Sequence, residues 1–281
     1  VYRNLLDENK HKDLKQDIIE IINSKSIQGI NQTREFILEK CQNERLLMIN
    51  ENHFYPNHRL FLTELLSSLK KMGFRYLALE AVEPEQDNAL NSGEEISLKT
   101  GFYTREQNFI ELINKAKDLN FEILSYDEIT NTENRELAQA RNIYNKTFAK
   151  DSEAKVIVLG GISHIFENPD TAGKLWMGYY FNVNYNINPI TFSQTTLNSY
   201  NHLIEEVAIV DSKHFIEKIY KTTDFQLINN IKKRDLNTNF KFRNKYNFPI
   251  QISFFHHNLE NENYSFESRL PFKNYLIQKN T

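Results

Sequence analysis

The stretch at residues 46–53, which reads LLMINENH, joins a short apolar run to a polar segment that holds a glutamate and a histidine. A run of four apolar residues bounded by polar ones is typical of a strand that is buried on both faces. Three similar runs follow: YLAL at 76–79, FEIL at 121–124 and VIVL at 156–159. Each of the four runs therefore predicts one buried strand.

Helical patterns separate these predicted strands. Leucines recur at helical spacing within residues 57–72, and Gly73 follows as a plausible helix stop. Residues 105–119 and 133–149 show the same kind of pattern. Short apolar strands that alternate with helices predict right-handed βαβ units. The expected fold is therefore an α/β domain with a mostly parallel central sheet and helices on both faces.

We interpret the whole chain, residues 1–281, as a single domain. Residues 1–44 form an N-terminal helical segment, residues 45–180 carry the core pattern, and residues 181–281 are expected to complete the sheet. The remaining expected elements are helices at 13–23 and 31–41 and strands at 189–194, 207–210 and 249–255.

Composition excludes several classes of function. The net charge is −3 and no long basic run exists, which disfavours a nucleic-acid partner. No apolar run approaches the roughly 20 residues of a membrane helix. Cys41 is the single cysteine, so a disulfide framework and a multi-cysteine zinc site are excluded.

The chain begins at Val1, which leaves open an exported or lipid-anchored protein with its leader removed as well as a cytoplasmic one. The oligomeric state also stays open.

The ends of the four predicted strands carry groups that can hold a proton or a metal. In open parallel sheets, ligands bind outside the carboxyl ends of the strands. The residues found there are Glu51 and His53 after the first strand, Glu80 and Glu83 after the second, Asp127 after the third and His164 after the fourth. Since neighbouring strands lie about 4.8 Å apart, such groups can converge. We therefore expect a cleft centred on His53, Glu80 and His164.

Two helix residues are expected beside the same cleft. His58 falls in the first turn after the first strand, and Arg135 falls in the first turn after the third. The charge of Arg135 would hold Glu51 or Glu80 ionised. Each residue also has a plainer interpretation. Arg135 would be a surface arginine, His58 a core histidine whose hydrogen bonds are satisfied, and Asp127 a helix cap.

Other motifs give little support to alternative chemistry. The pair at 160–161 is Gly-Gly without a dinucleotide or phosphate-loop pattern, so its expected role is to let the backbone turn and bring His164 over the sheet. No Gly-x-Ser-x-Gly elbow exists. Cys41 lies before the amino end of the first strand, whereas the expected site lies at the carboxyl ends of the strands. The adjacent pair at 256–257, His-His, would point to opposite faces of a strand, which does not suit one metal.

These motifs, in this order, resemble those of the erythromycin-esterase-like and ChaN-like superfamily. The matching segments are NENH at 50–53, LALEA at 77–81, RELA at 135–138, RNI at 141–143, GGISH at 160–164 and, more weakly, WMG at 176–178. The resemblance spans about residues 45–180. One departure is Asn50, which stands where the family usually has glycine.

The resemblance implies three functions and does not choose between them. The esterase branch hydrolyses macrolide lactones with a histidine base and no metal. The ChaN branch resembles haem-binding lipoproteins, and the more distant Tiki and TraB proteins include metal-dependent proteases.

The leading hypothesis is a hydrolase of a small-molecule ester or lactone that needs no cofactor. In it His53 takes a proton from water, because an imidazole has a pKa near neutrality. Glu51 or Glu80 would orient that ring, and His164 or Arg135 would stabilise the oxyanion. The residues expected to bind substrate are His58, Glu83 and Asp127.

Two alternatives use a cofactor. One is haem or iron binding by an exposed histidine or tyrosine. The other is a divalent metal held by His53, Glu80 and His164.

Overall fold

The computed structural model describes residues 14–127, 134–231, 250–254 and 273–277. The histidine pair at 256–257 lies outside these residues. The helices are α2 (Gln16–Lys25), α3 (Ile30–Lys40), α4 (Asn57–Lys71), α5 (Gln86–Asn91), α6 (Gln107–Asp118), α7 (Arg135–Lys146) and α8 (Met177–Tyr185). The strands are β1 (Ile27–Gln28), β2 (Leu46–Glu51), β3 (Tyr76–Leu79), β4 (Glu122–Ser125), β5 (Val156–Gly161), β6 (Ile190–Ser193), β7 (Val207–Asp211), β8 (Phe225–Asn229), β9 (Ile250–Phe254) and β10 (Lys273–Ile277). Short 3₁₀ helices are η2 (Tyr103–Arg105), η3 (Asn198–Leu203), η4 (Ser212–His214) and η5 (Lys218–Thr222).

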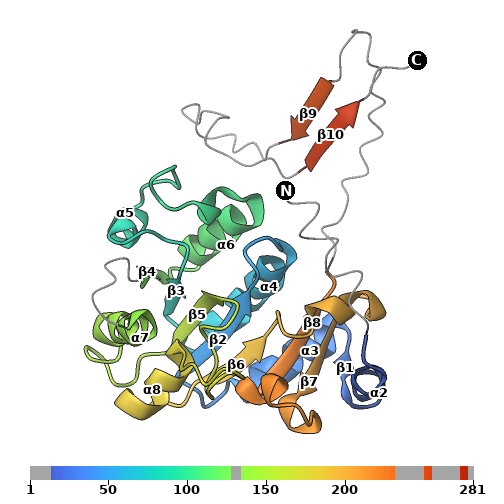
Figure 1. Ribbon diagram of the computed structural model, residues 1–281. Helices are drawn as coiled ribbons and strands as arrows, with labels where there is room; N and C mark the ends of the chain where they lie inside the picture. The colour runs from blue at the N-terminus through green and yellow to red at the C-terminus, as the bar shows by residue number, and fades with distance from the viewer. Residues whose placement is uncertain (1–13, 128–133, 232–249, 255–272, 278–281) are drawn as a thin grey trace.

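An eight-stranded sheet in the order β1-β7-β8-β6-β2-β5-β3-β4 forms the centre of the molecule (Figure 1). The six strands from β8 to β4 run parallel, whereas β7 is antiparallel to both of its neighbours. The predicted α/β fold with a mostly parallel sheet is thus confirmed. Along the described ranges, no helix has both the length and the apolar character that crossing a membrane requires.

The apolar runs are continuous because each strand buries both of its faces. In β2, Leu47 and Ile49 pack in a core cluster with leucines of α4 and α6. The alternate residues Leu46 and Met48 pack in a second cluster with side chains of α7 and α8. Helices therefore cover both faces of the sheet, as the strand pattern predicts.

The sequence pattern was less informative after residue 180. The expected strands at 189–194 and 207–210 appear as β6 and β7, and β6 lies between β2 and β8. The expected strand at 249–255 appears as β9, which pairs with β10 in a separate two-stranded sheet. Helix α8 and strand β8 were not predicted.

Candidate functional site

Three neighbouring strands, β2, β5 and β3, end at one edge of the sheet. Glu51 at the end of β2 lies opposite Gly161 at the end of β5. Directly after β3, the backbone N–H of Glu80 donates to the carbonyl oxygen of Leu159 at 3.3 Å. The parallel strands therefore bring two glutamates to either side of a glycine, and the loops that follow β2 and β5 carry His53 and His164.

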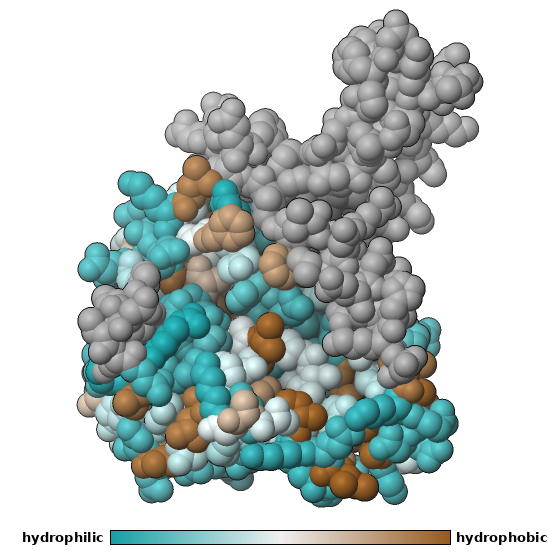
Figure 2. Space-filling view, viewed as in Figure 1, coloured by the Kyte–Doolittle hydropathy of each residue, from teal (hydrophilic) through white to brown (hydrophobic). Residues whose placement is uncertain are grey.

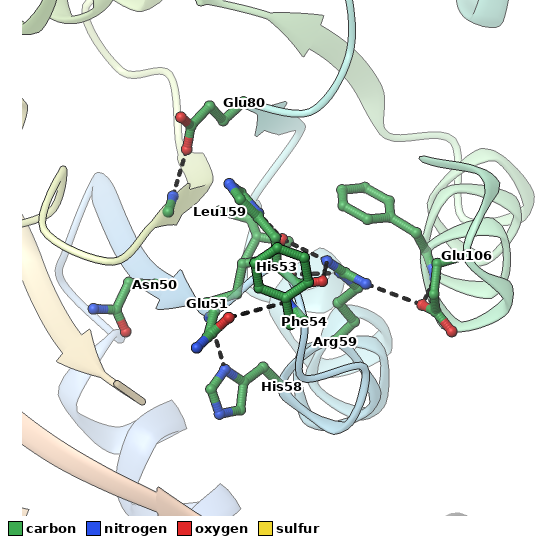
Figure 3. Close-up of polar contacts among 12 residues, drawn as sticks. Asn50, Glu51, His53, Phe54, His58, Arg59, Glu80, Glu106 and Leu159 are labelled. Carbon is green, nitrogen blue, oxygen red and sulfur yellow. Dashed lines mark hydrogen bonds and ion pairs between the residues drawn. The ribbon is translucent and has the colours of Figure 1, made fainter. Parts of the chain in front are cut away.

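Glu51 and His53 form a hydrogen-bonded pair (Figure 3). The distance from Nδ1 of His53 to Oε1 of Glu51 is 2.7 Å. Because an ionised carboxylate only accepts hydrogen bonds, this contact places the proton on Nδ1 and leaves the lone pair of a neutral ring on Nε2. The His53 side chain keeps 20% of its surface exposed, whereas that of Glu51 keeps 2%. The pair therefore has a buried carboxylate and an imidazole nitrogen that is available for proton transfer.

A buried arginine fixes the carboxylate of this pair. Arg59, on α4, donates from Nε to Oε2 of Glu51 at 2.6 Å and from Nη2 to Oε1 at 2.8 Å. Its Nη1 donates to Oε2 of Glu106 at 3.0 Å, and that glutamate caps the N-terminus of α6. Burial acts to raise the pKa of Glu51, but the charge and hydrogen bonds of Arg59 and His53 outweigh it and lower this pKa to about 2. Glu51 therefore stays ionised at neutral pH.

Gly161 allows Glu80 and His53 to approach the same point. A Cβ at residue 161 would lie 2.9 Å from Oε2 of Glu80, closer than real Cβ contacts, and 3.0 Å from Nε2 of His53, tighter than most of them. The backbone N–H of Gly161 instead donates to Oε2 of Glu80. The absence of a side chain on this residue therefore creates the small space that both groups face.

Glu80 is also paired with Arg135. Nη2 of Arg135 donates to Oε1 of Glu80 at 2.9 Å, and its Nε and Nη2 donate to the two oxygens of Asp127 at 2.9 Å. Arg135 begins α7 and keeps 43% of its side chain exposed. Its guanidinium therefore joins the ends of β3 and β4 and presents positive charge to solvent at the site.

His164 lies between two carboxylates. Its Nδ1 is 2.7 Å from Oε2 of Glu136, and its Nε2 is 3.1 Å from Oε1 of Glu80. Burial acts to lower the pKa of His164, but the hydrogen bonds to Glu136 and Glu80 outweigh it and raise this pKa to about 9. His164 is therefore an imidazolium at neutral pH, and its 3.4 Å approach to Nη1 of Arg135 is a contact between two donors, not a hydrogen bond.

His164 and His53 together set the pKa of Glu80. Burial acts to raise it, while His164, His53 and the N–H of Gly161 lower it to about 2. Glu51 and Glu80 are therefore ionised at pH 7.

The other expected site residues lie at different depths. His58 is on the first turn of α4 but fully buried, beneath the loop that carries His53. Its Nδ1 accepts a hydrogen bond from the backbone N–H of Asn52 at 3.0 Å, and burial lowers its pKa to about 4, so that it is neutral. Glu83 is exposed to solvent.

Asn50, the departure from the family pattern, links β2 to the loop after β6. Its fully buried side chain donates to Oγ1 of Thr195 at 2.8 Å and accepts from the backbone N–H of Gln194 at 2.6 Å. It also donates to the carbonyl oxygen of Ile162. An amide here therefore fastens together the ends of β2, β5 and β6, which a glycine could not do.

Three residues with clear structural roles were missing from the predicted site: Arg59, Glu106 and Glu136. Each is a charged residue near the start of a helix, where charged side chains are usually solvated, and nothing in one sequence distinguishes a buried one. The spacing gives a partial signal for Arg59 and Glu136, because both fall in the first turn of the helix that follows a strand end.

The alternative metal set of His53, Glu80 and His164 does not fit a divalent ion. The two ring nitrogens of His164 already have carboxylate partners, Nδ1 with Glu136 and Nε2 with Glu80. Across the ranges that the structure describes, no three histidine, cysteine, aspartate or glutamate side chains are arranged to hold a metal.

Comparisons with known proteins bear on the fold. No protein-family model matches the chain, and no curated protein does. Among solved structures, a succinoglycan biosynthesis protein is 9% identical, with 76% of this chain and 96% of that one covered and a TM-score of 0.56.

Two other solved structures are similar to lesser degrees. ChaN of Campylobacter jejuni, described with cofacial haem binding, is 12% identical, with 73% of this chain and 96% of that one covered and a TM-score of 0.43. The C-terminal region of Pasteurella multocida toxin, described as having a thiol-protease-like triad, is 15% identical over 69% of this chain and 30% of that one, with a TM-score of 0.41. At the level of the fold, the similarity to the succinoglycan biosynthesis protein agrees with the α/β architecture that the sequence predicts.

Proposed function

We propose that this protein is a hydrolase that cleaves a small-molecule ester or lactone, with His53 as the general base. The contact between Nδ1 of His53 and Glu51 carries the proposal. A buried carboxylate that holds one ring nitrogen fixes the tautomer and the orientation of the ring, and the other nitrogen can then accept a proton. The clamp by Arg59 keeps that carboxylate charged throughout the cycle.

The reaction begins when Nε2 of His53 takes a proton from a water molecule whose oxygen attacks the carbonyl carbon. The resulting tetrahedral intermediate carries a negative charge on the former carbonyl oxygen. Arg135 and the imidazolium of His164 are the fixed cations at the site and would stabilise that charge. Asp127 would act through Arg135, whose guanidinium it orients.

The second step breaks the bond between the carbonyl carbon and the alcohol oxygen. His53 returns its proton to that oxygen, so that the products are a carboxylic acid and an alcohol. Glu51 stays ionised and offsets the positive charge on the ring between the two steps.

The test compares wild type, His53→Ala and the exposed control His202→Ala on a panel of 4-nitrophenyl esters and simple lactones, with and without EDTA. We expect wild type and His202→Ala to hydrolyse at equal rates that EDTA does not change. His53→Ala should lose about a hundred- to ten-thousand-fold in rate. Activity that survives in His53→Ala contradicts the proposal, and activity that EDTA abolishes replaces it with a metal-dependent one. Haem uptake without any hydrolysis would favour a binding protein.

A further inference from the structure

Three aromatic side chains, Phe54, Phe102 and Tyr103, form a wall beside His53, and this set is called the aromatic wall below. The ring of Tyr103 stacks on that of His53, with centroids 4.2 Å apart and planes at 21°. Phe102 and Phe54 meet the ring of Tyr103 edge to face, at 5.1 and 6.3 Å. The aromatic wall is thus continuous with the proposed catalytic base.

The segment that carries Phe102 and Tyr103 is fastened at both ends. Before it, Gly101 approaches Ala81, the residue after Glu80, so closely that any Cβ at position 101 would clash with the Ala81 carbonyl oxygen. The neighbouring carbonyl oxygen of Thr100 accepts a hydrogen bond from the backbone N–H of Glu83 at 2.9 Å. Both contacts join the segment to the end of β3.

After the wall, Glu106 pairs with the buried Arg59 that clamps Glu51. The wall is therefore held between the two carboxylates of the site, Glu51 and Glu80.

This segment leaves one aromatic ring largely exposed, with the guanidinium of Arg105 over it at 4.8 Å from the ring centroid. Phe102 is 58% exposed, although its neighbours Tyr103 and Thr104 are largely covered. Ile162, which directly follows Gly161, is 54% exposed at the same edge of the sheet. Apolar side chains of this kind interrupt a mostly hydrophilic surface (Figure 2). A fixed aromatic ring provides a large apolar contact area and loses little conformational entropy when a ligand covers it.

We propose that the aromatic wall binds the apolar part of the substrate, which is therefore an ester or lactone with a bulky apolar group next to its carbonyl. This inference rests on the proposed function, because the wall has this role only if the carbonyl meets His53. The apolar group would cover Phe102 and Tyr103 and would be removed from water on binding. Specificity then comes from apolar area, and each methylene that becomes fully buried adds about three- to fourfold in affinity.

The test measures kcat/KM for 4-nitrophenyl acetate and 4-nitrophenyl hexanoate in wild type, Phe102→Ala, Phe102→Leu and the control Val183→Ala. Val183 is an apolar residue on α8 that is 61% exposed. We expect the hexanoate-to-acetate ratio to fall by about tenfold in Phe102→Ala, to recover in part in Phe102→Leu and to stay at the wild-type value in Val183→Ala. A ratio in Phe102→Ala that equals the wild-type ratio overturns the inference and leaves the proposed function standing.

A binding measurement keeps the inference testable if no ester is hydrolysed. Calorimetric titration of wild type and Phe102→Ala with hexanamide and acetamide requires no turnover. Tighter binding of hexanamide that Phe102→Ala removes supports the wall as the surface that binds the apolar group. Equal affinity of wild type for the two amides overturns it.

Discussion

Nδ1 of His53 lies 2.7 Å from Oε1 of Glu51, and the carboxylate that makes this contact is itself held by two hydrogen bonds from Arg59. The arrangement places a charged pair in the protein interior and leaves one imidazole nitrogen at the surface of the site. Folding and the proposed catalysis therefore depend on the same three residues.

Loss of Arg59 should destabilise the fold strongly. Arg59→Met leaves the buried charge of Glu51 without its main partner, and breaking a buried pair from one side costs about 3–5 kcal/mol in the free energy of unfolding. Chemical denaturation measures this change. Arg34→Met, which removes an exposed hydrogen bond to Asn31, should stay within about 0.5 kcal/mol of wild type.

The double variant Glu51→Met/Arg59→Met separates loss of the pair from loss of packing. It should be more stable than Arg59→Met, because neither charge is then left alone in the interior. A double variant that is less stable than Arg59→Met would mean that side-chain volume, not charge, is what the site requires.

Gly161→Ala should reduce turnover far more than it reduces stability. Its methyl group would lie too close to Oε2 of Glu80 and tightly against Nε2 of His53, so the Glu80 carboxylate must shift and the His53 ring is crowded. Displacing a catalytic group by about 1 Å can cost about a hundredfold in rate. The check is kcat/KM on an ester that wild type hydrolyses, together with the melting temperature. Full activity in Gly161→Ala would show that the two groups do not need this close approach.

The protonation of His164 can be followed by fluorescence, because Trp176, the single tryptophan of the chain, has its ring centroid 5.8 Å from that of His164. A protonated imidazole quenches indole emission. Emission should therefore rise as the pH passes through about 9, and His164→Gln should abolish this transition. Lys174, which lies over the Trp176 ring, is checked with Lys174→Met. A transition that persists in His164→Gln would assign it to another group.

The raised pKa of His164 also predicts how this residue affects the free energy of unfolding as the pH changes. Its pKa in the folded state lies above the ordinary value of 6.5, so the folded state binds this proton more tightly than the unfolded state does. The stabilisation is complete below pH 6.5 and is lost as the pH rises through about 9.

Strands β2, β3 and β5 were predictable because burial on both faces gives each of them an unbroken apolar run, whereas the run of β4 contains the exposed Glu122. The convergence of Glu51, His53, Glu80 and His164 was predictable because parallel strands end at one edge, so position along the chain implies position in space. Arg59 was not identifiable, since a charged residue in an amphipathic helix is usually solvated. Strand β8, which reads FQLIN, contains a buried glutamine and was missed because polar residues interrupt its apolar pattern.

His58 shows why location along the chain is not enough. The sequence places it on the correct turn, but only the packing of α4 against the sheet decides that its ring faces inward. Asn50 was recognised as a departure from the family pattern, yet its role depends on Thr195 and Gln194, which are more than 140 residues away in the sequence.

A second group of acids, which are half-buried, predicts a different pH effect. Glu167 and Asp224 both contact Thr191, and their carboxyl groups interact. Burial and the charge of Asp224 raise the pKa of Glu167 to about 8, and burial raises that of Asp224. Since the folded state prefers the protonated acid, stability should fall as the pH rises from 4.5 through about 8.

Glu167→Gln should weaken this dependence, because the amide stays neutral and can still hydrogen-bond to Thr191. Chemical denaturation at pH 5 and pH 8 measures this dependence of stability on pH. The control is Glu153→Gln, which changes an exposed residue. The variant should lose less stability than wild type between the two values. An equal loss in both proteins would show that Glu167 is not the group that titrates.

The central claim is that His53 is the base, and chemical rescue tests it most directly. His53→Gly should leave an imidazole-sized gap between Tyr103 and Gly161 and should hydrolyse esters at least a hundredfold more slowly than wild type. Added imidazole should restore the rate of this variant in proportion to its concentration and should have no such effect on His202→Gly. Hydrolysis by His53→Gly at the wild-type rate without imidazole would contradict the account.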